Sequence, residues 1–194
     1  GWFGFNAGSA LAADGNAGMA MVVTHISAAT ASLVWMLMDW SRFGKPTLIG
    51  LVTGTIAGLA SITPASGSVG PIGALIIGAS AGIICYLFVN IVKNNLKIDD
   101  SLDVFAVHGV GGLLGIILVA FLVDANIGGA GYADGINAIS QLMIQLKGTV
   151  AVLVLSVVAT IVITYVVKLT VGLRVDDSSE VEGLDISSHG ETNG

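Results

Sequence analysis

Residues 102–123 read LDVFAVHGVGGLLGIILVAFLV, a run long enough and apolar enough to cross a lipid bilayer as a helix. An acid, Asp103, stands at its start, and His108 lies inside the apolar run. An ionisable side chain within a membrane span is a candidate functional site, because its charged form is costly in hydrocarbon. The stretch therefore predicts a membrane-spanning helix and a site built around His108.

The composition of the chain points to the same class of protein. Of its 194 residues, 54% are hydrophobic and only 10% are charged, and the mean hydropathy is +0.91. Water-soluble domains carry about 25% charged residues. We therefore predict an all-α fold, a polytopic transmembrane helical bundle in the lipid bilayer, with no nucleic acid as a partner.

Charge-free runs set the number of spans, since a spanning helix needs about 20 predominantly apolar residues. The longest run, residues 46–92, has room for two helices, and SITPASGSVGP at 61–71 divides it with two prolines. We predict five complete spans, near residues 17–39, 47–62, 70–92, 103–123 and 143–172.

The two ends of the sequence differ in character. GWFGFNAGSALAA, residues 1–13, is apolar but too short to span, and it lacks the basic start of a signal peptide. We expect it to be the end of another span, so that the sequence is the C-terminal part of a longer protein. After residue 173 the chain becomes acidic and polar. We therefore divide it into a transmembrane region, 1–173, and a tail, 174–194.

Basic residues predict the orientation. Arg42 and Lys93 follow the first and third predicted spans, and Lys168 lies near the end of the fifth, whereas the loops 63–71 and 124–141 contain no Lys or Arg. Basic residues mark the cytoplasmic side of a membrane protein. We expect a multi-pass protein of the cell (plasma or inner) membrane with a cytoplasmic C-terminus.

His108 is the sharpest candidate site residue. On a helix its face holds Val104, Gly111, Gly112 and Gly115, none of which has a hydrogen-bonding side chain. We therefore expect its partner on another helix, in a file of water or in a permeant species. The alternative is a histidine bonded to a neighbouring helix for packing alone.

Two other titratable residues have structural interpretations beside functional ones. The segment DDS at 99–101 offers helix caps and acids suit a helix N-terminus, so a capping role for Asp103 competes with a proton-handling one. For His25 we favour a structural role. Nearby hydroxyl side chains can satisfy its ring: Thr24, Ser27 and Thr30.

Trp2, Phe5 and Ser9 are spaced three and four residues apart and so share one helix face. An aromatic face with a hydroxyl can hold a small cation by cation–π attraction and a hydrogen bond. An interfacial aromatic belt, or packing, is the alternative. The sequence shows no nucleophile–base pair, phosphate-binding glycine loop or Cys/His metal spacing, so we expect neither an enzyme nor a cofactor or metal.

Taken together, four segments resemble the ammonium transporter (Amt/Mep/Rh) family, its microbial Amt branch in particular. They cover nearly the whole chain in family order: GWFGFNAGSALAA, GKPTLIGLVTGTIAGLASITPASGSV, DDSLDVFAVHGVGGLLG, and LTVGLRV followed by EGLDISSHGE. The resemblance implies a homotrimer of eleven-span subunits, each with its own pore. This chain would supply the end of span six and spans seven to eleven.

The resemblance also implies roles for single residues. His108 matches the second of the family's two pore histidines, Phe5 a phenylalanine that gates the outer mouth, and Ser9 the hydroxyl of the external cation site. No pore role transfers to His25. Ammonium would be recruited outside and deprotonated, and ammonia would pass His108.

Two other functions compete with plain transport. Family tails bind PII-type signalling proteins, so the chain could be an ammonium-responsive sensor or regulatory module that acts through its tail. A generic helical packing subunit would account for the glycines, but it leaves His108 and the tail motif without an explanation.

Overall fold

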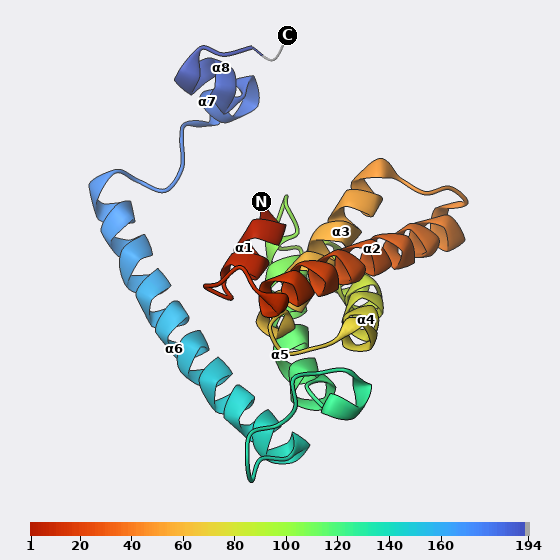
Figure 1. Cartoon of the computed structure of the whole chain (residues 1–194). Helices are drawn as coiled ribbons and strands as arrows, with labels where there is room; N and C mark the ends of the chain where they lie inside the picture. Colours follow the sequence, from red (N-terminus) through yellow and green to blue (C-terminus); the bar gives the residue numbers. More distant parts are fainter. Residues whose placement is uncertain (193–194) are drawn as a thin grey trace. The chain divides into compact units, whose positions relative to one another are not determined.

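In the computed structural model, which describes residues 1–192, all regular structure within that range is helical (Figure 1). Among these described residues, five helices are long and apolar enough to cross a membrane, so the predicted all-α fold with five spans is confirmed. The α-helices are α1 (Trp2–Gly8), α2 (Gly15–Phe43), α3 (Leu48–Ile62), α4 (Pro71–Asn90), α5 (Gly111–Leu122), α6 (Ala138–Thr170), α7 (Asp177–Glu182) and α8 (Leu184–His189). Shorter 3-10 and π-helical turns are η1 (Thr63–Ala65), η2 (Ile91–Asn95), η3 (Phe105–Val110) and η4 (Ala125–Ile127).

The bounds of α2 show how local chemistry sets the ends of a span. The carboxylate of Asp14 accepts hydrogen bonds from the backbone N–H groups of Asn16 and Ala17, at 2.9 and 3.1 Å, and so caps the first turn. At the other end Gly44 adopts φ 74°, a left-handed conformation that suits glycine and stops the helix. The helix is therefore longer at both ends than the predicted 17–39.

The chain forms two compact units, Gly1–Lys147 and Gly148–Gly194, and the boundary lies within α6. The first unit contains α1 to α5, and the described part of the second contains the rest of α6 with α7 and α8. The predicted division into a transmembrane region, 1–173, and a tail, 174–194, describes where the chain leaves the membrane. It stays a prediction.

In the first unit, α2 packs against both α3 and α4 (Figure 1). Glycines of α3 and α4 make the close approach possible. A Cβ atom on Gly54 would lie 2.5 Å from the Cβ of Trp35, and one on Gly78 would lie 2.5 Å from the carbonyl oxygen of Ser27. Small residues allow close helix packing in a membrane, where the hydrophobic drive between helices is weak.

The helix α5 approaches α3 in the same way. A Cβ on Gly111 would lie 2.8 Å from the Oγ of Ser61, and one on Gly115 would overlap the Ser61 carbonyl and lie 2.9 Å from Pro64. By contrast, a Cβ on Gly112 would have nothing within 4 Å. Gly111 and Gly115 therefore lie at the contact between α5 and α3, whereas Gly112 does not.

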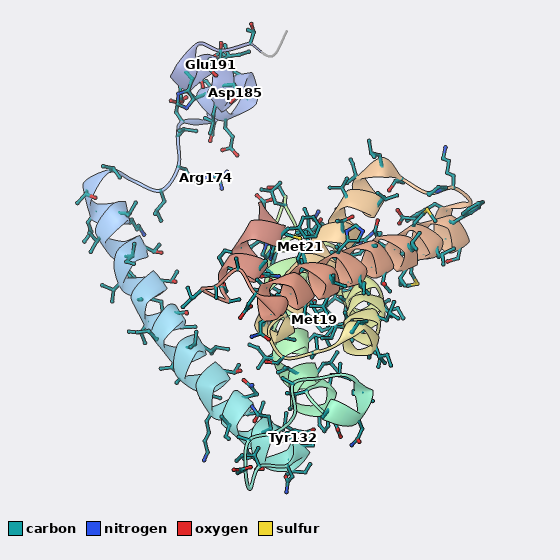
Figure 2. All side chains as sticks on the ribbon, viewed as in Figure 1. Met19, Met21, Tyr132, Arg174, Asp185 and Glu191 are labelled. Atoms are coloured by element: carbon teal, nitrogen blue, oxygen red, sulfur yellow. The ribbon has the colours of Figure 1, made fainter. Side chains whose placement is uncertain are left out.

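Exposed apolar side chains cover the outside of the spans. Met19 and Met21, labelled in Figure 2, are 43% and 49% exposed on α2. Along α6, no residue is buried within the described chain. An apolar surface of this extent is typical of contact with lipid or with another protein.

The tail has a well-defined cap. The carboxylate of Asp176 accepts hydrogen bonds from the Oγ of Ser178 at 2.5 Å and from the N–H of Ser179 at 2.9 Å. These bonds favour the ionised form and lower the pKa of this carboxyl from 3.8 to about 2. Arg174 and Glu180 form an ion pair nearby.

We expect Gly115→Ala to destabilise the protein by roughly 1–3 kcal/mol, because its methyl group would press on the backbone of α3. Gly112→Ala is the matched control on the same helix, where the added methyl meets open space. Thermal unfolding of the purified protein in detergent measures both. Equal melting temperatures for the two variants would contradict the contact.

We expect the first turn of α7 to lose stability as the pH falls. The folded pKa of Asp176 is lower than its ordinary value, so the cap contributes fully above pH 3.8 and is lost through about pH 2. The amide resonance of Ser179, followed by NMR, reports the loss. Asp176→Asn keeps a good capping group, so its signal should not show this titration; the same transition in the variant would assign it elsewhere.

Candidate functional site

His108 lies in η3, where the helix has a π-helical turn. Such turns are rare and are frequent at functional sites. The wide turn changes the register, so the predicted single face is wrong in part. His108 and Val104 are exposed, whereas Gly111 and Gly115 are buried against α3. No signal in the sequence marks this turn, because regular α-helical spacing was the only pattern available.

The imidazole of His108 stacks on the indole of Trp2, with ring centroids 5.9 Å apart and an interplanar angle of 26°. The contact of this imidazole with another helix is therefore a stack on an aromatic ring of α1 and not the expected hydrogen bond. Within residues 1–192, no protein group hydrogen-bonds to this imidazole. A neutral imidazole has one donor and one acceptor nitrogen, so the ring can serve a small polar molecule beside it.

A hydrogen bond at the far edge of the indole orients Trp2. Its Nε1–H donates to the Oγ1 of Thr63 at 2.7 Å. The Thr63 hydroxyl in turn donates to the carbonyl of Leu59 at 2.8 Å and lies 3.3 Å from the Oδ1 of Asn6. The indole is thus tied to the end of α3 as well as to its own helix.

Asn6 extends this network into α2. Its Nδ2 donates to the Oγ1 of Thr24 at 3.0 Å, and the Thr24 hydroxyl donates to the carbonyl of Ala20 at 2.6 Å. Asn6 and Thr24 are both buried. Their bonds satisfy polar atoms that would otherwise be costly in an apolar setting, and they join α1 to α2.

Phe5, in the middle of α1, and Ser9, which follows its last residue, are exposed. Gly1, Trp2 and Phe5 line an open cavity of about 370 Å³. The Ser9 hydroxyl donates to the carbonyl of Phe5 at 2.8 Å. A hydroxyl whose hydrogen is used in this way presents only lone pairs, which suits an N–H donor such as a small cation.

The imidazole of His25 does not have the predicted hydroxyl partners. The hydroxyls of Thr24, Ser27 and Thr30 all donate to backbone carbonyls, at 2.6, 2.9 and 2.7 Å, rather than to the ring. Thr24 and Ser27 are buried, whereas His25 is exposed on another side of α2. The imidazole instead lies 5.7 Å from the ring of Phe3.

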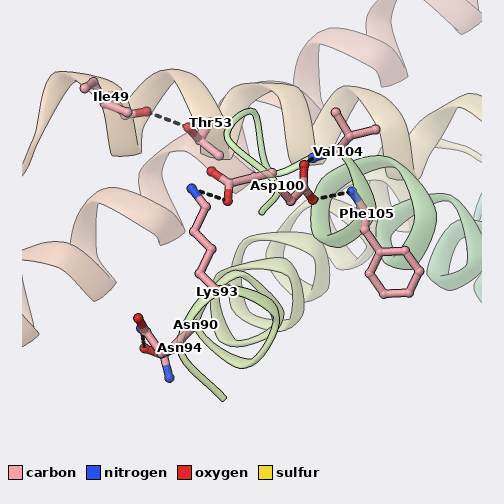
Figure 3. Close-up of polar contacts among 9 residues, drawn as sticks. Ile49, Thr53, Asn90, Lys93, Asn94, Asp100, Val104 and Phe105 are labelled. Atoms are coloured by element: carbon pink, nitrogen blue, oxygen red, sulfur yellow. Dashed lines mark hydrogen bonds and ion pairs between the residues drawn. The ribbon is translucent and has the colours of Figure 1, made fainter. Parts of the chain in front are cut away.

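The segment before η3 divides its acids between two tasks (Figure 3). The carboxylate of Asp100 caps the turn and accepts from the N–H groups of Val104 and Phe105, both at 2.9 Å. Asp103 makes an ion pair with Lys93 at 2.8 Å. The predicted capping segment at 99–101 therefore supplies the cap, and Asp103 has a different structural contact.

Sequence reasoning missed Thr63, Asn6 and Lys93. Asn6 lies within the motif GWFGFN, between Phe5 and Ser9 of the predicted aromatic face. This position was the one available signal. The contacts of the other two depend on tertiary structure. Among residues 1–192, no group of three or more His, Cys, Asp or Glu side chains could hold a metal ion.

Comparison with known proteins gives consistent matches over the whole chain. The model of the Ammonium Transporter Family matches residues 1–194. The chain is 47% identical to an ammonium transporter of Aquifex aeolicus, a match that covers 98% of this chain and 45% of that protein. It is 46% identical to the ammonium transporter Amt1 of Archaeoglobus fulgidus, covering 98% of this chain and 48% of that protein. The chain thus spans about half the length of these curated relatives.

Solved structures give the same picture. A structure named Sensor Amt Protein has a TM-score of 0.86 at 31% identity, covering 96% of this chain and 45% of that one. Saccharomyces cerevisiae Mep2 has a TM-score of 0.76 at 36% identity, covering 88% of this chain and 42% of that one.

We expect Thr24→Val to destabilise the protein by about 1–3 kcal/mol, because it leaves the buried amide of Asn6 without its acceptor. Thr30→Val is the matched control, since that hydroxyl donates only to the carbonyl of Ile26 on its own helix. Thermal unfolding in detergent compares the two. A control as destabilised as Thr24→Val would mean that the bond from Asn6 contributes little.

Proposed function

The chain belongs to the ammonium transporter family, and from that premise we propose that it is the C-terminal half of a transporter subunit that moves ammonium or ammonia across a membrane. The observation that carries the proposal is the imidazole of His108, stacked on Trp2 and free of protein hydrogen bonds within residues 1–192. We propose no enzymatic activity.

The surroundings of His108 favour a neutral permeant molecule. Burying an unpaired cation in a low-dielectric setting is far more costly than burying ammonia. A pore that conducts the intact ion needs rings of carbonyls or carboxylates. Around η3 the structure offers indole, valine and glycine surface, and the nearby carboxylate of Asp103 is paired with Lys93.

The exposed end of α1 supports a separate recruitment step. The Ser9 oxygen is turned into an acceptor by its own bond to Phe5, and aromatic faces attract cations. We propose that Ser9 and Phe5 take part in binding ammonium outside, that the ion then loses a proton, and that ammonia passes His108. The imidazole serves as a hydrogen-bonding waypoint in an otherwise apolar path.

The assembly and setting follow the family premise. We propose a homotrimer of eleven-span subunits in the plasma or inner membrane, with residues 174–194 in the cytoplasm. Within residues 174–192, the tail contains two short helices, α7, which Asp176 caps, and α8, and a PII-type signalling protein is the proposed partner for it.

An ammonium-responsive sensor is the second candidate, and the match to the structure named Sensor Amt Protein favours it. Removal of residues 175–194 from the full-length protein separates the two functions. Retained uptake with lost regulation assigns the tail to control of a transporter. Unchanged uptake and unchanged regulation would exclude a regulatory tail.

We expect His108→Ala to reduce ammonium transport by the full-length protein by about tenfold or more, or to alter its selectivity. The reason is that an apolar path loses its polar waypoint. His25→Ala is the matched control, since that imidazole contacts Phe3 and takes no part in the stack of His108 on Trp2. Ammonium-evoked currents in proteoliposomes measure both. Unchanged currents and selectivity in His108→Ala would refute the assigned role.

A further inference from the structure

Asp103 and Lys93 form an ion pair at the start of the segment that carries His108. The Nζ of Lys93 lies 2.8 Å from the Oδ1 of Asp103, drawn as a dashed line in Figure 3. The Asp103 side chain is only 17% exposed, against 38% for Lys93. Within residues 1–147, all of which the structure describes, it is the only ion pair. A charged pair in so apolar a unit calls for a specific role.

The backbone of Asp103 is unusual. Its φ is 56°, in the left-handed region that non-glycine residues rarely adopt. A residue held in such a conformation persists when its surroundings determine it, and it marks functional sites more often than chance. The capping work is done by Asp100, so the side chain of Asp103 is available to hold this conformation through Lys93.

The position of Asp103 links the ion pair to the histidine. Its carbonyl accepts the N–H of Val107 at 2.8 Å, and its own N–H donates to the carbonyl of Asp100 at 3.2 Å. Val107 directly precedes His108 in the π-helical turn. The backbone conformation of Asp103 therefore sets where η3 begins and how the imidazole of His108 is oriented.

Lys93 lies on a second π-helical segment, η2, which continues α4. The N–H of Leu96 donates to the carbonyl of Ile91 at 2.9 Å, a bond that closes this segment. Since α4 packs against η3 directly, the ion pair adds a polar tie to an existing apolar contact. It closes the loop of residues 96–102 between the two segments.

We propose that Lys93 and Asp103 are positioning residues whose ion pair sets the start of η3 and thereby holds His108 against Trp2. Neither side chain contacts the permeant molecule in this role. The inference rests on the proposed function, because it assigns a supporting pair to the same site. It also resolves the choice for Asp103 in favour of structure over proton transfer.

The test uses three variants of the full-length protein: Asp103→Asn, Lys93→Met, and the reversed pair Lys93→Asp with Asp103→Lys. We expect each single variant to lower the maximal rate of methylammonium uptake by about tenfold to a hundredfold, since small misplacements of a functional group have effects of this size. The KM should change by less than about twofold, because the proposed recruitment site on α1 is untouched. The reversed pair should recover most of the rate.

Lys97→Met is the control, because it removes a nearby lysine outside the pair and should leave the rate unchanged. Single variants with normal rates would overturn the proposal. So would a folded reversed pair that is as slow as Asp103→Asn, because that result would make the Asp103 carboxylate itself essential.

Amide hydrogen exchange over residues 104–110 provides a readout that does not need transport. We expect faster exchange in both single variants and recovery in the reversed pair, because the ion pair holds the first turn of η3. A full-length protein that fails to transport ammonium would contradict the proposed function, while the exchange data would still test the ion pair. Unchanged exchange in the single variants would refute the positioning role of the ion pair.

Discussion

The cost of an unsatisfied polar group in an apolar medium governs this structure. The buried hydroxyls of α2 donate to backbone carbonyls, either on their own helix, as Thr24 does, or on α3, as Ser27 does. The buried amide of Asn6 finds Thr24, and the indole N–H of Trp2 finds Thr63. The bonds of Ser27, Asn6 and Trp2 also tie one helix to another. The need to satisfy polar atoms therefore fixes the arrangement of α1, α2 and α3.

His108 differs from these buried polar groups, because its imidazole is exposed, and this gives the site its chemistry. Its ring is held by stacking on Trp2 rather than by a hydrogen bond within residues 1–192. Stacking orients the imidazole without using its nitrogens, so they remain able to donate to or accept from a small molecule. Two sets of contacts position this ring. The polar network at Trp2 acts through the aromatic partner of the ring, and the ion pair before η3 acts through the backbone that carries it.

The spans, their number and a helix cap from the segment 99–101 could be predicted from the sequence, because apolar run length and local side-chain chemistry determine them. The face of His108 could not, because the π-helical turn of η3 breaks the regular spacing on which that prediction depended. Nor could the surroundings of His25, since which side of α2 is buried is decided by packing against α3 and α4. The pairing of Lys93 with Asp103 likewise depends on tertiary structure.

In the proposed function, the path beside His108 accepts a small neutral molecule and rejects an intact cation. The most direct measurement is the response of proteoliposomes containing the full-length protein to an ammonium gradient and to an equal potassium gradient. We expect transport evoked by ammonium and none by potassium, because potassium has no neutral form in which to cross an apolar path. Equal transport of both ions would contradict it, since such a result requires a pore that replaces the hydration shell of a cation.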